Sequence, residues 1–173
     1  MTLSPAWLRW PETQALVAAF APQGDCLRFV GGAVRDAVLG REVVEVDAAT
    51  SLLPEAVMAL LAQAGMKALP TGLAHGKVTA VVGARSFEIT TLRSDVETDG
   101  RHATVSFTDD WKEDASRRDF TMNALYLDAY GTLFDYFGGV DDARAGRVQF
   151  IGDAGLRIQE DYLRILRFFR FHA

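Results

Sequence analysis

The 173-residue chain has little cysteine and proline, and it has no long apolar run. Cys26 is the single cysteine, so no disulfide can form within the chain, and we expect a buried thiol and a reducing compartment. No stretch approaches the roughly 18–20 apolar residues that cross a bilayer, and the N-terminus lacks the pattern of a secretory signal. We therefore expect no membrane partner.

Positive charge is also scarce, because 18 Lys and Arg residues against 23 Asp and Glu residues give a formal net charge of −5. Nucleic-acid backbones attract basic surfaces, so this balance argues against the chain holding such a backbone by itself. A local patch or another domain could still do so. The hydrophobic fraction of 49% is typical of a globular protein with one domain, or one domain and the start of another.

Periodicity and turn residues predict a mixture of helices and strands. The polar stretch over 94–106 predicts a mobile loop. We expect helices over residues 11–21, 33–39, 54–64, 110–117 and from about 154 to the end, and strands over 26–30, 43–48, 77–82, 86–92, 122–127, 133–137 and 147–151.

Two carboxylates, Glu45 and Asp47, flank Val46 in a predicted strand. Alternate strand residues point to the same face, so these carboxylates should lie side by side. They would repel each other unless a divalent cation lay between them. Glu88, on a neighbouring predicted strand, is a candidate third metal ligand. The alternative for the pair is a solvated strand edge, and the alternative for Glu88 is a simple alternation of polar and apolar residues over Ser86-Phe87-Glu88.

A glycine pair, Gly31-Gly32, comes directly before a predicted helix. Glycine lets backbone N–H groups approach phosphate oxygens near the positive end of a helix dipole, and Arg35 could add a bidentate contact. The alternative is an ordinary turn followed by a surface arginine. Together with the two carboxylates, the pattern indicates a site for a metal-bound nucleoside triphosphate.

Several motifs in order extend this pattern along the chain. They are Gly31-Gly32-Ala33-Val34-Arg35-Asp36, Leu39-Gly40-Arg41, Glu45-Val46-Asp47-Ala48-Ala49-Thr50, Arg117-Arg118-Asp119-Phe120-Thr121-Met122-Asn123-Ala124 and Glu160-Asp161-x-x-Arg164. With these motifs the sequence, from about residue 25 to 172, resembles the class II tRNA nucleotidyltransferases (CCA-adding enzymes) and their bacterial poly(A) polymerase relatives, in the DNA polymerase β-like superfamily. It is most similar to the mitochondrial and alphaproteobacterial branch.

The resemblance implies an α+β fold: a nucleotidyltransferase head over residues 1–138 with a mixed sheet of about five strands. The first helix of a helical neck would follow within 139–173. The last helix carries much apolar surface with no stop signal, which predicts a truncated chain or a pairing with another chain. The family would place the protein in the bacterial cytoplasm or, in a eukaryote, in the mitochondrial matrix.

The implied activity is addition of CMP and AMP from CTP and ATP to the 3′ end of tRNA, with release of pyrophosphate. Two Mg²⁺ ions would assist, held by Glu45 and Asp47 as catalytic carboxylates and by Glu88. The tRNA would bind mainly to further domains. A poly(A) polymerase of the same class and a catalytically weak nucleotide-binding fragment are the alternatives. The family has Asp at the first metal position, so Glu45 should keep the metal but could shift its alignment.

The resemblance also implies how the base is selected. Asp161 and Arg164 would lie on one helical face and pair with the amino group and ring nitrogen that cytosine and adenine share, rejecting uracil and guanine. A solvated ladder of ion pairs is the alternative. Arg118 would lie near the ribose or phosphates, and Arg167 and Arg170 would continue an arginine stripe toward the triphosphate.

Overall fold

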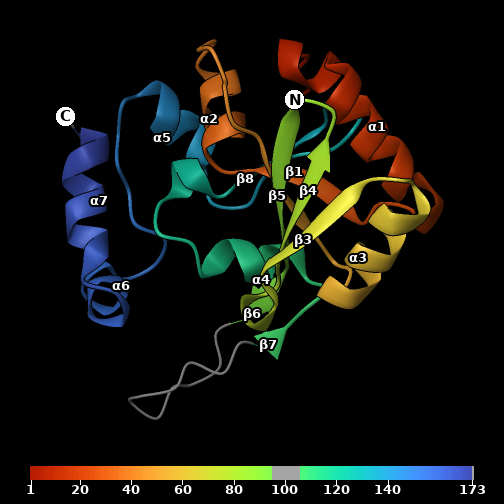
Figure 1. Cartoon of the computed structure of the whole chain (residues 1–173). Coiled ribbons are helices and arrows are strands. Elements are labelled where there is room, and N and C mark those ends of the chain that lie inside the picture. Colours follow the sequence, from red (N-terminus) through yellow and green to blue (C-terminus); the bar gives the residue numbers. More distant parts are fainter. Residues whose placement is uncertain (95–105, 173) are drawn as a thin grey trace.

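A mixed seven-stranded sheet forms the centre of the computed structural model, which describes residues 1–94 and 106–172 (Figure 1). The strand order is β3-β4-β5-β2-β1-β8-β9. Strands β2 and β5 run parallel, and the other neighbours in this sheet are antiparallel. The strands are β1 (Leu27–Val30), β2 (Asp47–Thr50), β3 (Lys67–Gly72), β4 (Lys77–Val82), β5 (Arg85–Thr91), β8 (Leu125–Leu127) and β9 (Leu133–Asp135); β6 (Arg93–Ser94) and β7 (Ser106–Phe107) form a separate pair.

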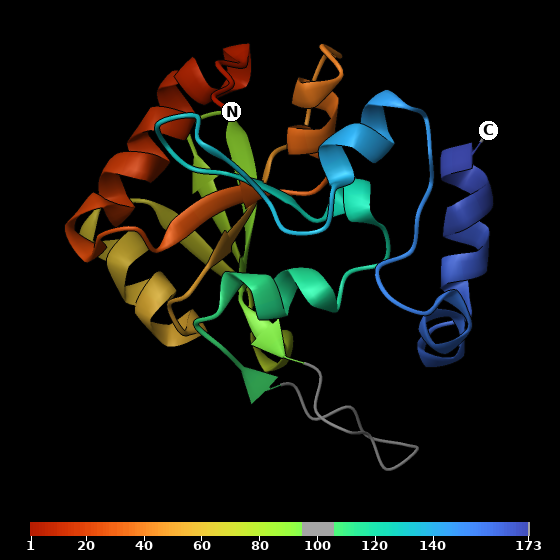
Figure 2. The ribbon, with the colours of Figure 1, turned by 180° about the vertical axis from the view of Figure 1, so that it is seen from behind.

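Helices cover both faces of the sheet, and the C-terminal helices stand at one side of the molecule (Figures 1 and 2). The α-helices are α1 (Pro11–Phe20), α2 (Gly32–Val38), α3 (Pro54–Gln63), α4 (Trp111–Ser116), α5 (Gly139–Arg144), α6 (Ala154–Glu160) and α7 (Leu163–His172). Short 3-10 helices are η1 (Ala6–Arg9), η2 (Ala21–Gln23), η3 (Leu73–His75) and η4 (Thr121–Asn123).

The main hydrophobic core lies between the sheet and helices α1 and α3. Leu16 of α1 and Leu61 of α3 are fully buried with Phe29 and Ile89 of the sheet. Both helices begin at a proline, which suits the first helical position because its missing N–H would have no partner there. On the opposite face, Tyr126 packs with α4 in a second cluster. Buried side chains thus pack against both faces of the sheet.

The predicted α+β class is correct, but the estimate of about five strands is too low. Strand β3 lacks a clear alternating pattern in the sequence and forms because it pairs with β4. The prediction of a strand over 147–151 is wrong, because the structure has only an isolated bridge there, between Phe120 and Phe150. Cys26 is buried, as predicted. Most of the loop predicted over 94–106 lies outside the described residues.

The single helix predicted from residue 154 onward is broken between α6 and α7. Asp161 has an extended backbone (φ −154°, ψ 104°), and its Oδ1 accepts a hydrogen bond from the Leu163 backbone N–H at 2.9 Å. A carboxylate in this role caps the start of a new helix. Asp161 and Arg164 therefore do not share a helical face as predicted. The apolar surface predicted for the last helix is present, with Leu166 and Phe169 both more than 60% exposed.

Glycine is required where α5 begins. A Cβ on Gly139 would lie 2.1 Å from the backbone oxygen of Thr121, closer than any real contact. The Asp135 carboxylate accepts hydrogen bonds from the backbone N–H groups of Gly139 and Val140 at 2.9 and 3.0 Å. These contacts fix α5 against η4, and η4 in turn carries residues of the candidate site.

Candidate functional site

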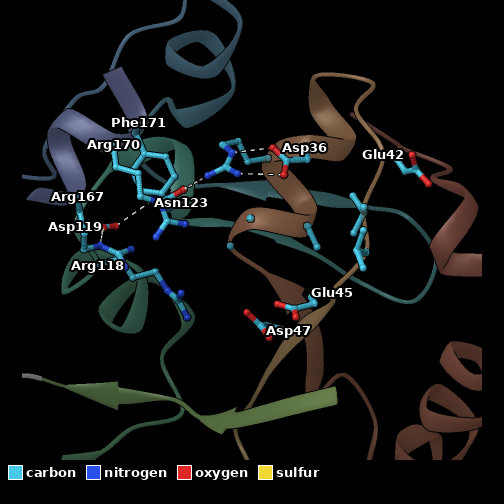
Figure 3. Close-up of a pocket in the computed structure, with 16 residues that line it drawn as sticks. Asp36, Glu42, Glu45, Asp47, Arg118, Asp119, Asn123, Arg167, Arg170 and Phe171 are labelled. Atoms are coloured by element: carbon cyan, nitrogen blue, oxygen red, sulfur yellow. Dashed lines mark hydrogen bonds and ion pairs between the residues drawn. The ribbon is translucent and has the colours of Figure 1, made fainter. Parts of the chain in front are cut away.

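A cavity of about 580 Å³ lies between α2, the segment before β2, η4 and α7 (Figure 3). Its lining includes most of the residues singled out in the sequence. Glu88, Asp161 and Arg164 are not among the described residues that line it. The predicted residues in the lining are Gly31, Gly32, Arg35, Glu45, Asp47, Arg118, Arg167 and Arg170.

The strand register brings the glycines and the carboxylates together. Val30 lies opposite Asp47 in the antiparallel β1–β2 pair, so Gly31 leaves the sheet beside Asp47. Gly31 has a φ of 74°, in the left-handed region that favours glycine, and α2 begins at the next residue. Nothing lies within 4 Å of where its Cβ would be. The backbone therefore stays accessible at this turn.

Glu45 and Asp47 both line the cavity, as predicted from their alternation, although the strand predicted over 43–48 begins only at Asp47, as β2, and Glu45 precedes it. Val46 between them is buried at 3% exposure, whereas both acids are exposed. They lie across the cavity from α7 (Figure 3). Partial desolvation, followed by the negative charges of Glu88 and Glu45, raises the pKa of Asp47 above its ordinary value. A cation between these side chains would relieve that repulsion, so this donor pair fits a divalent metal.

Glu88 lies next to Asp47 but is engaged elsewhere. Ala48 pairs with Ile89 across the parallel β2–β5 ladder, which places Glu88 beside Asp47. However, Lys77 Nζ donates a hydrogen bond to Glu88 Oε1 at 2.7 Å. Within residues 1–94 and 106–172, no group of three or more Asp, Glu, His or Cys residues is arranged to hold a metal. Glu88 would have to leave its ion pair with Lys77 to become the third ligand.

A polar chain links α2 to α7 across η4. Arg35 pairs with Asp36 and donates through Nη1 to Asn123 Oδ1 at 2.9 Å. Asn123 Nδ2 donates to Asp119 Oδ1 at 3.3 Å, and Arg167 Nε donates to Asp119 Oδ2 at 2.7 Å. Arg35 and Arg167 are thus held at the cavity wall by partners from distant segments.

Phe171 is a pocket residue that the sequence did not reveal. Its ring lies 5.0, 5.8 and 5.3 Å from the guanidinium carbons of Arg35, Arg167 and Arg170. A cation over an aromatic face at such distances is attracted by the ring. Phe171 therefore gathers three positive groups at the end of the cavity opposite the carboxylates (Figure 3). Its position four residues after Arg167 on a helix was the available signal.

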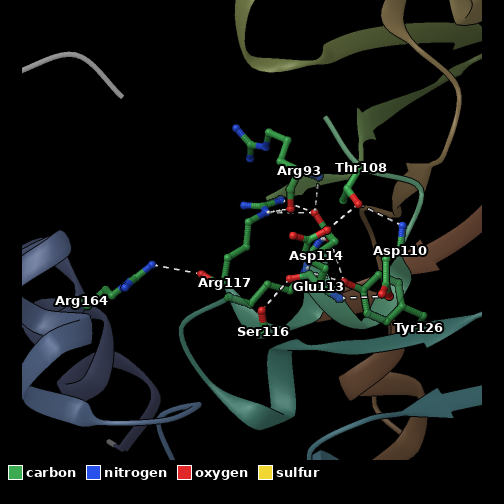
Figure 4. A network of polar contacts seen from close by, with 10 residues as sticks. Arg93, Thr108, Asp110, Glu113, Asp114, Ser116, Arg117, Tyr126 and Arg164 are labelled. Carbon is green, nitrogen blue, oxygen red and sulfur yellow. Dashed lines mark hydrogen bonds and ion pairs between the residues drawn. The ribbon is translucent and has the colours of Figure 1, made fainter. Parts of the chain in front are cut away.

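Arg118 lines the cavity and pairs with Asp114. Asp114 belongs to a buried network of polar contacts (Figure 4). Asp114 accepts hydrogen bonds from the Tyr126 hydroxyl at 2.7 Å, from Arg118, and from Arg117. Burial by itself would raise the pKa of Asp114, but the guanidinium groups of Arg118 and Arg117 and the hydrogen bonds from Tyr126 and the Arg93 backbone lower it to about 2. This carboxylate therefore stays ionised and orients Arg118.

The predicted base-selecting pair is held in other contacts. Arg164 Nη1 donates to the Arg157 backbone oxygen at 2.9 Å and to Glu160 at 2.6 Å, and Nη2 donates to the Arg117 backbone oxygen at 3.2 Å (Figure 4). Asp161 caps α7. The alternative ladder of ion pairs is present in altered form, because Glu160 is the acid that pairs with both Arg157 and Arg164.

Comparisons with known proteins show the family to which the chain is similar. Residues 27–149 match the family described as the poly A polymerase head domain. The chain is 52% identical over 148 residues to the mitochondrial CCA tRNA nucleotidyltransferase 1 of Danio rerio, across 85% of this chain and 34% of that relative. The chain therefore spans about a third of the length of this relative.

Solved structures show the same fold. The crystal structure of the Bacillus stearothermophilus CCA-adding enzyme in complex with CTP has a TM-score of 0.82 and 41% identity, over 92% of this chain and 38% of that chain. A tRNA nucleotidyltransferase complexed with a primer tRNA and an incoming ATP analogue has a TM-score of 0.69 and 30% identity, over 90% and 44% of the two chains. In the described part of this chain, no helix has the length and apolar character to span a membrane.

Proposed function

Since this chain belongs to the poly(A) polymerase head-domain family, we propose that the protein adds CMP and AMP from CTP and ATP to the 3′ end of tRNA and releases pyrophosphate. The observation that carries the proposal is the shared cavity, in which two adjacent carboxylates face a cluster of arginines across a glycine turn. This arrangement suits a metal-bound triphosphate, whose negative charge both a cation and guanidinium groups would neutralise.

Some residues of the cavity would bind the metal, and others would bind the phosphates of the nucleotide. Glu45 and Asp47 would hold Mg²⁺, which supplies charge neutralisation and activates a hydroxyl nucleophile when bound. The backbone at Gly31 and Gly32, together with Arg35, would contact phosphate oxygens. Because the terminal phosphates are the most negative part of the nucleotide, the arginines gathered by Phe171 would bind that end; these are Arg35, Arg167 and Arg170. Arg118, oriented by Asp114, would contact the ribose or the α-phosphate.

Selection of the base by Asp161 and Arg164 remains part of the proposal, with one added requirement. Arg164 must exchange its contacts with Glu160 and the Arg117 backbone oxygen for the base, and Asp161 must release the start of α7. The contact with Glu160 and the Asp161 cap both lie at the break between α6 and α7. We therefore expect nucleotide binding to rearrange this break.

We also propose the division of the chain into a head over 1–138 and the start of a neck over 139–173. Most of the tRNA would be bound outside these residues, which agrees with the net charge of −5. The compartment would be the bacterial cytoplasm or the mitochondrial matrix.

The decisive experiment supplies the protein with tRNA that lacks its terminal CCA, together with CTP, ATP and Mg²⁺. We expect exactly three added residues in the order C, C, A, with loss of transfer in Glu45→Gln. Glu55→Gln, an exposed acid at the start of α3, is the matched control and should transfer normally. A long A tail with CTP unused would support a poly(A) polymerase instead. Nucleotide binding without pyrophosphate release would support a non-catalytic module.

A further inference from the structure

A second, smaller hollow of about 180 Å³ lies next to the candidate site. The two hollows share Val44 and Glu45, so these residues form the wall between them. Val44 is 76% exposed, which is unusual for a large apolar side chain. The hollow is also lined by Trp10, just before α1, and by Arg85 at the start of β5. Drug-sized ligands occupy about 300–1,000 Å³, so this space suits a single ring system.

Trp10 and Arg85 form a stacked pair in this hollow. The Arg85 guanidinium carbon lies 3.4 Å from the centroid of the Trp10 ring. The nearest acid, Glu12, is 3.8 Å from Arg85 Nε, which is beyond hydrogen-bond distance. The Arg85 side chain is 37% exposed. Proteins that bind single-stranded nucleic acids use this combination, because every base can stack on an aromatic ring or a guanidinium plane.

The position of the hollow relative to the carboxylates indicates which substrate it would receive. In nucleotidyl transfer the attacking hydroxyl approaches the phosphorus from the side opposite the leaving pyrophosphate. The arginines gathered around Phe171 lie across the cavity from Glu45 and Asp47 (Figure 3), and would hold the phosphate end of the nucleotide. The acceptor strand must then enter from beyond the carboxylates. The Trp10–Arg85 hollow lies beyond Glu45.

We propose that this hollow is the subsite for the terminal nucleotide of the acceptor RNA, whose base stacks on the Trp10–Arg85 pair. The base would be anchored on one side of the Val44–Glu45 wall while its ribose hydroxyl reaches the metal-binding carboxylates. The proposal rests on the proposed function, because an acceptor strand is required only if the protein transfers nucleotides. It adds to that function a place for the second substrate, whose stacking residues Trp10 and Arg85 lie outside every motif found in the sequence.

The test compares Arg85→Gln and Trp10→Phe with two controls. Arg9→Gln removes an equal charge from an exposed arginine of η1 that does not line the hollow. Glu12→Gln removes the acid partner of Arg85 but leaves the Trp10–Arg85 pair intact. Steady-state transfer gives the KM for acceptor tRNA and for CTP. Fluorescence anisotropy with a labelled tRNA, in the absence of nucleotide and metal, gives acceptor affinity without requiring transfer.

We expect Arg85→Gln to raise the KM and the dissociation constant for tRNA by about 5- to 150-fold, the range that corresponds to losing one base-stacking contact. Trp10→Phe should have a smaller effect in the same direction, and the KM for CTP should stay within about twofold. Both control variants should behave as the unmodified protein does.

If Arg85→Gln and Arg9→Gln bind tRNA with equal affinity, the proposed acceptor subsite is wrong. It is also wrong if Glu12→Gln loses as much tRNA affinity as Arg85→Gln does, because the Glu12–Arg85 ion pair would then act only structurally. A rise in the KM for CTP matching that for tRNA would show that the substitutions disturb Glu45 rather than the acceptor. If the unmodified protein transfers nothing, the proposed function fails, while the anisotropy arm still decides whether the hollow binds RNA.

Discussion

Replacing Asp114 with asparagine should destabilise the fold strongly and weaken nucleotide binding. Asp114 is 1% exposed and accepts hydrogen bonds from the Tyr126 hydroxyl at 2.7 Å and from Arg118 Nη2 at 3.1 Å. It also pairs with Arg117. Asparagine keeps the shape of the side chain but removes the charge. Two guanidinium groups would then be left beside a neutral amide.

The magnitude follows from the pKa of this carboxyl. The network lowers the pKa of Asp114 from 3.8 to about 2, and each unit corresponds to about 1.4 kcal/mol, so ionisation of Asp114 contributes roughly 2.5 kcal/mol to the free energy of unfolding. Breaking a buried ion pair by removing one partner costs about 3–5 kcal/mol, because the other charge is left uncompensated. We therefore expect a loss of about 3 kcal/mol at pH 7.

The dependence on pH has a definite sign. The folded pKa lies below the unfolded one, so the stabilisation is fully present above about pH 4 and is lost as the pH falls toward 2. The free energies of unfolding of the unmodified protein and of Asp114→Asn, measured in urea, should therefore differ by a constant amount from pH 5 to 7. The difference should shrink below pH 4.

Asp109→Asn provides the control, since it makes the same chemical change at an exposed position nearby. It should change the free energy of unfolding by less than about 0.5 kcal/mol. If the free energies of unfolding of Asp114→Asn and the unmodified protein differ by less than about 1 kcal/mol at pH 7, the proposed role of the Asp114 charge is wrong. A difference that stays constant down to pH 2 would also refute it, since the charge of Asp114 would then not be the cause.

Three further predictions concern the candidate site. Lys77→Met removes the ammonium group that engages Glu88, so Mn²⁺ should bind about 3- to 10-fold more tightly in a calorimetric titration; unchanged or weaker binding would contradict this. Glu45→Asp restores the family's shorter side chain and should raise the rate of CMP transfer without loss of Mg²⁺ binding, because misplacement by ~1 Å can cost ~10²-fold. No gain in single-turnover rate would count against Glu45 as a metal ligand. Asp161→Ala and Arg164→Ala should admit UTP and GTP, and intact discrimination in competition assays would exclude them as the base-selecting pair.

The sequence by itself determined the local features of the site. Alternation at Glu45 and Asp47 predicted both acids on one side, and both line the cavity, although β2 itself begins only at Asp47. The turn at Gly31 followed from glycine's access to positive φ, and helices α1 and α3 from a proline at their first position. These features depend only on residues that are neighbours along the chain. They can therefore be predicted from the sequence.

The tertiary structure decided which partners the side chains have. Glu88 engages Lys77 because the β4–β5 register brings them together, and Asp161 ends a helix that periodicity alone would continue. Trp10 and Arg85 meet although 75 positions separate them in the chain. Partners of this kind depend on strand register and on how helices pack. The physical reason is that burial and pairing energies act between segments brought together by the fold, whereas sequence patterns report only on the local backbone.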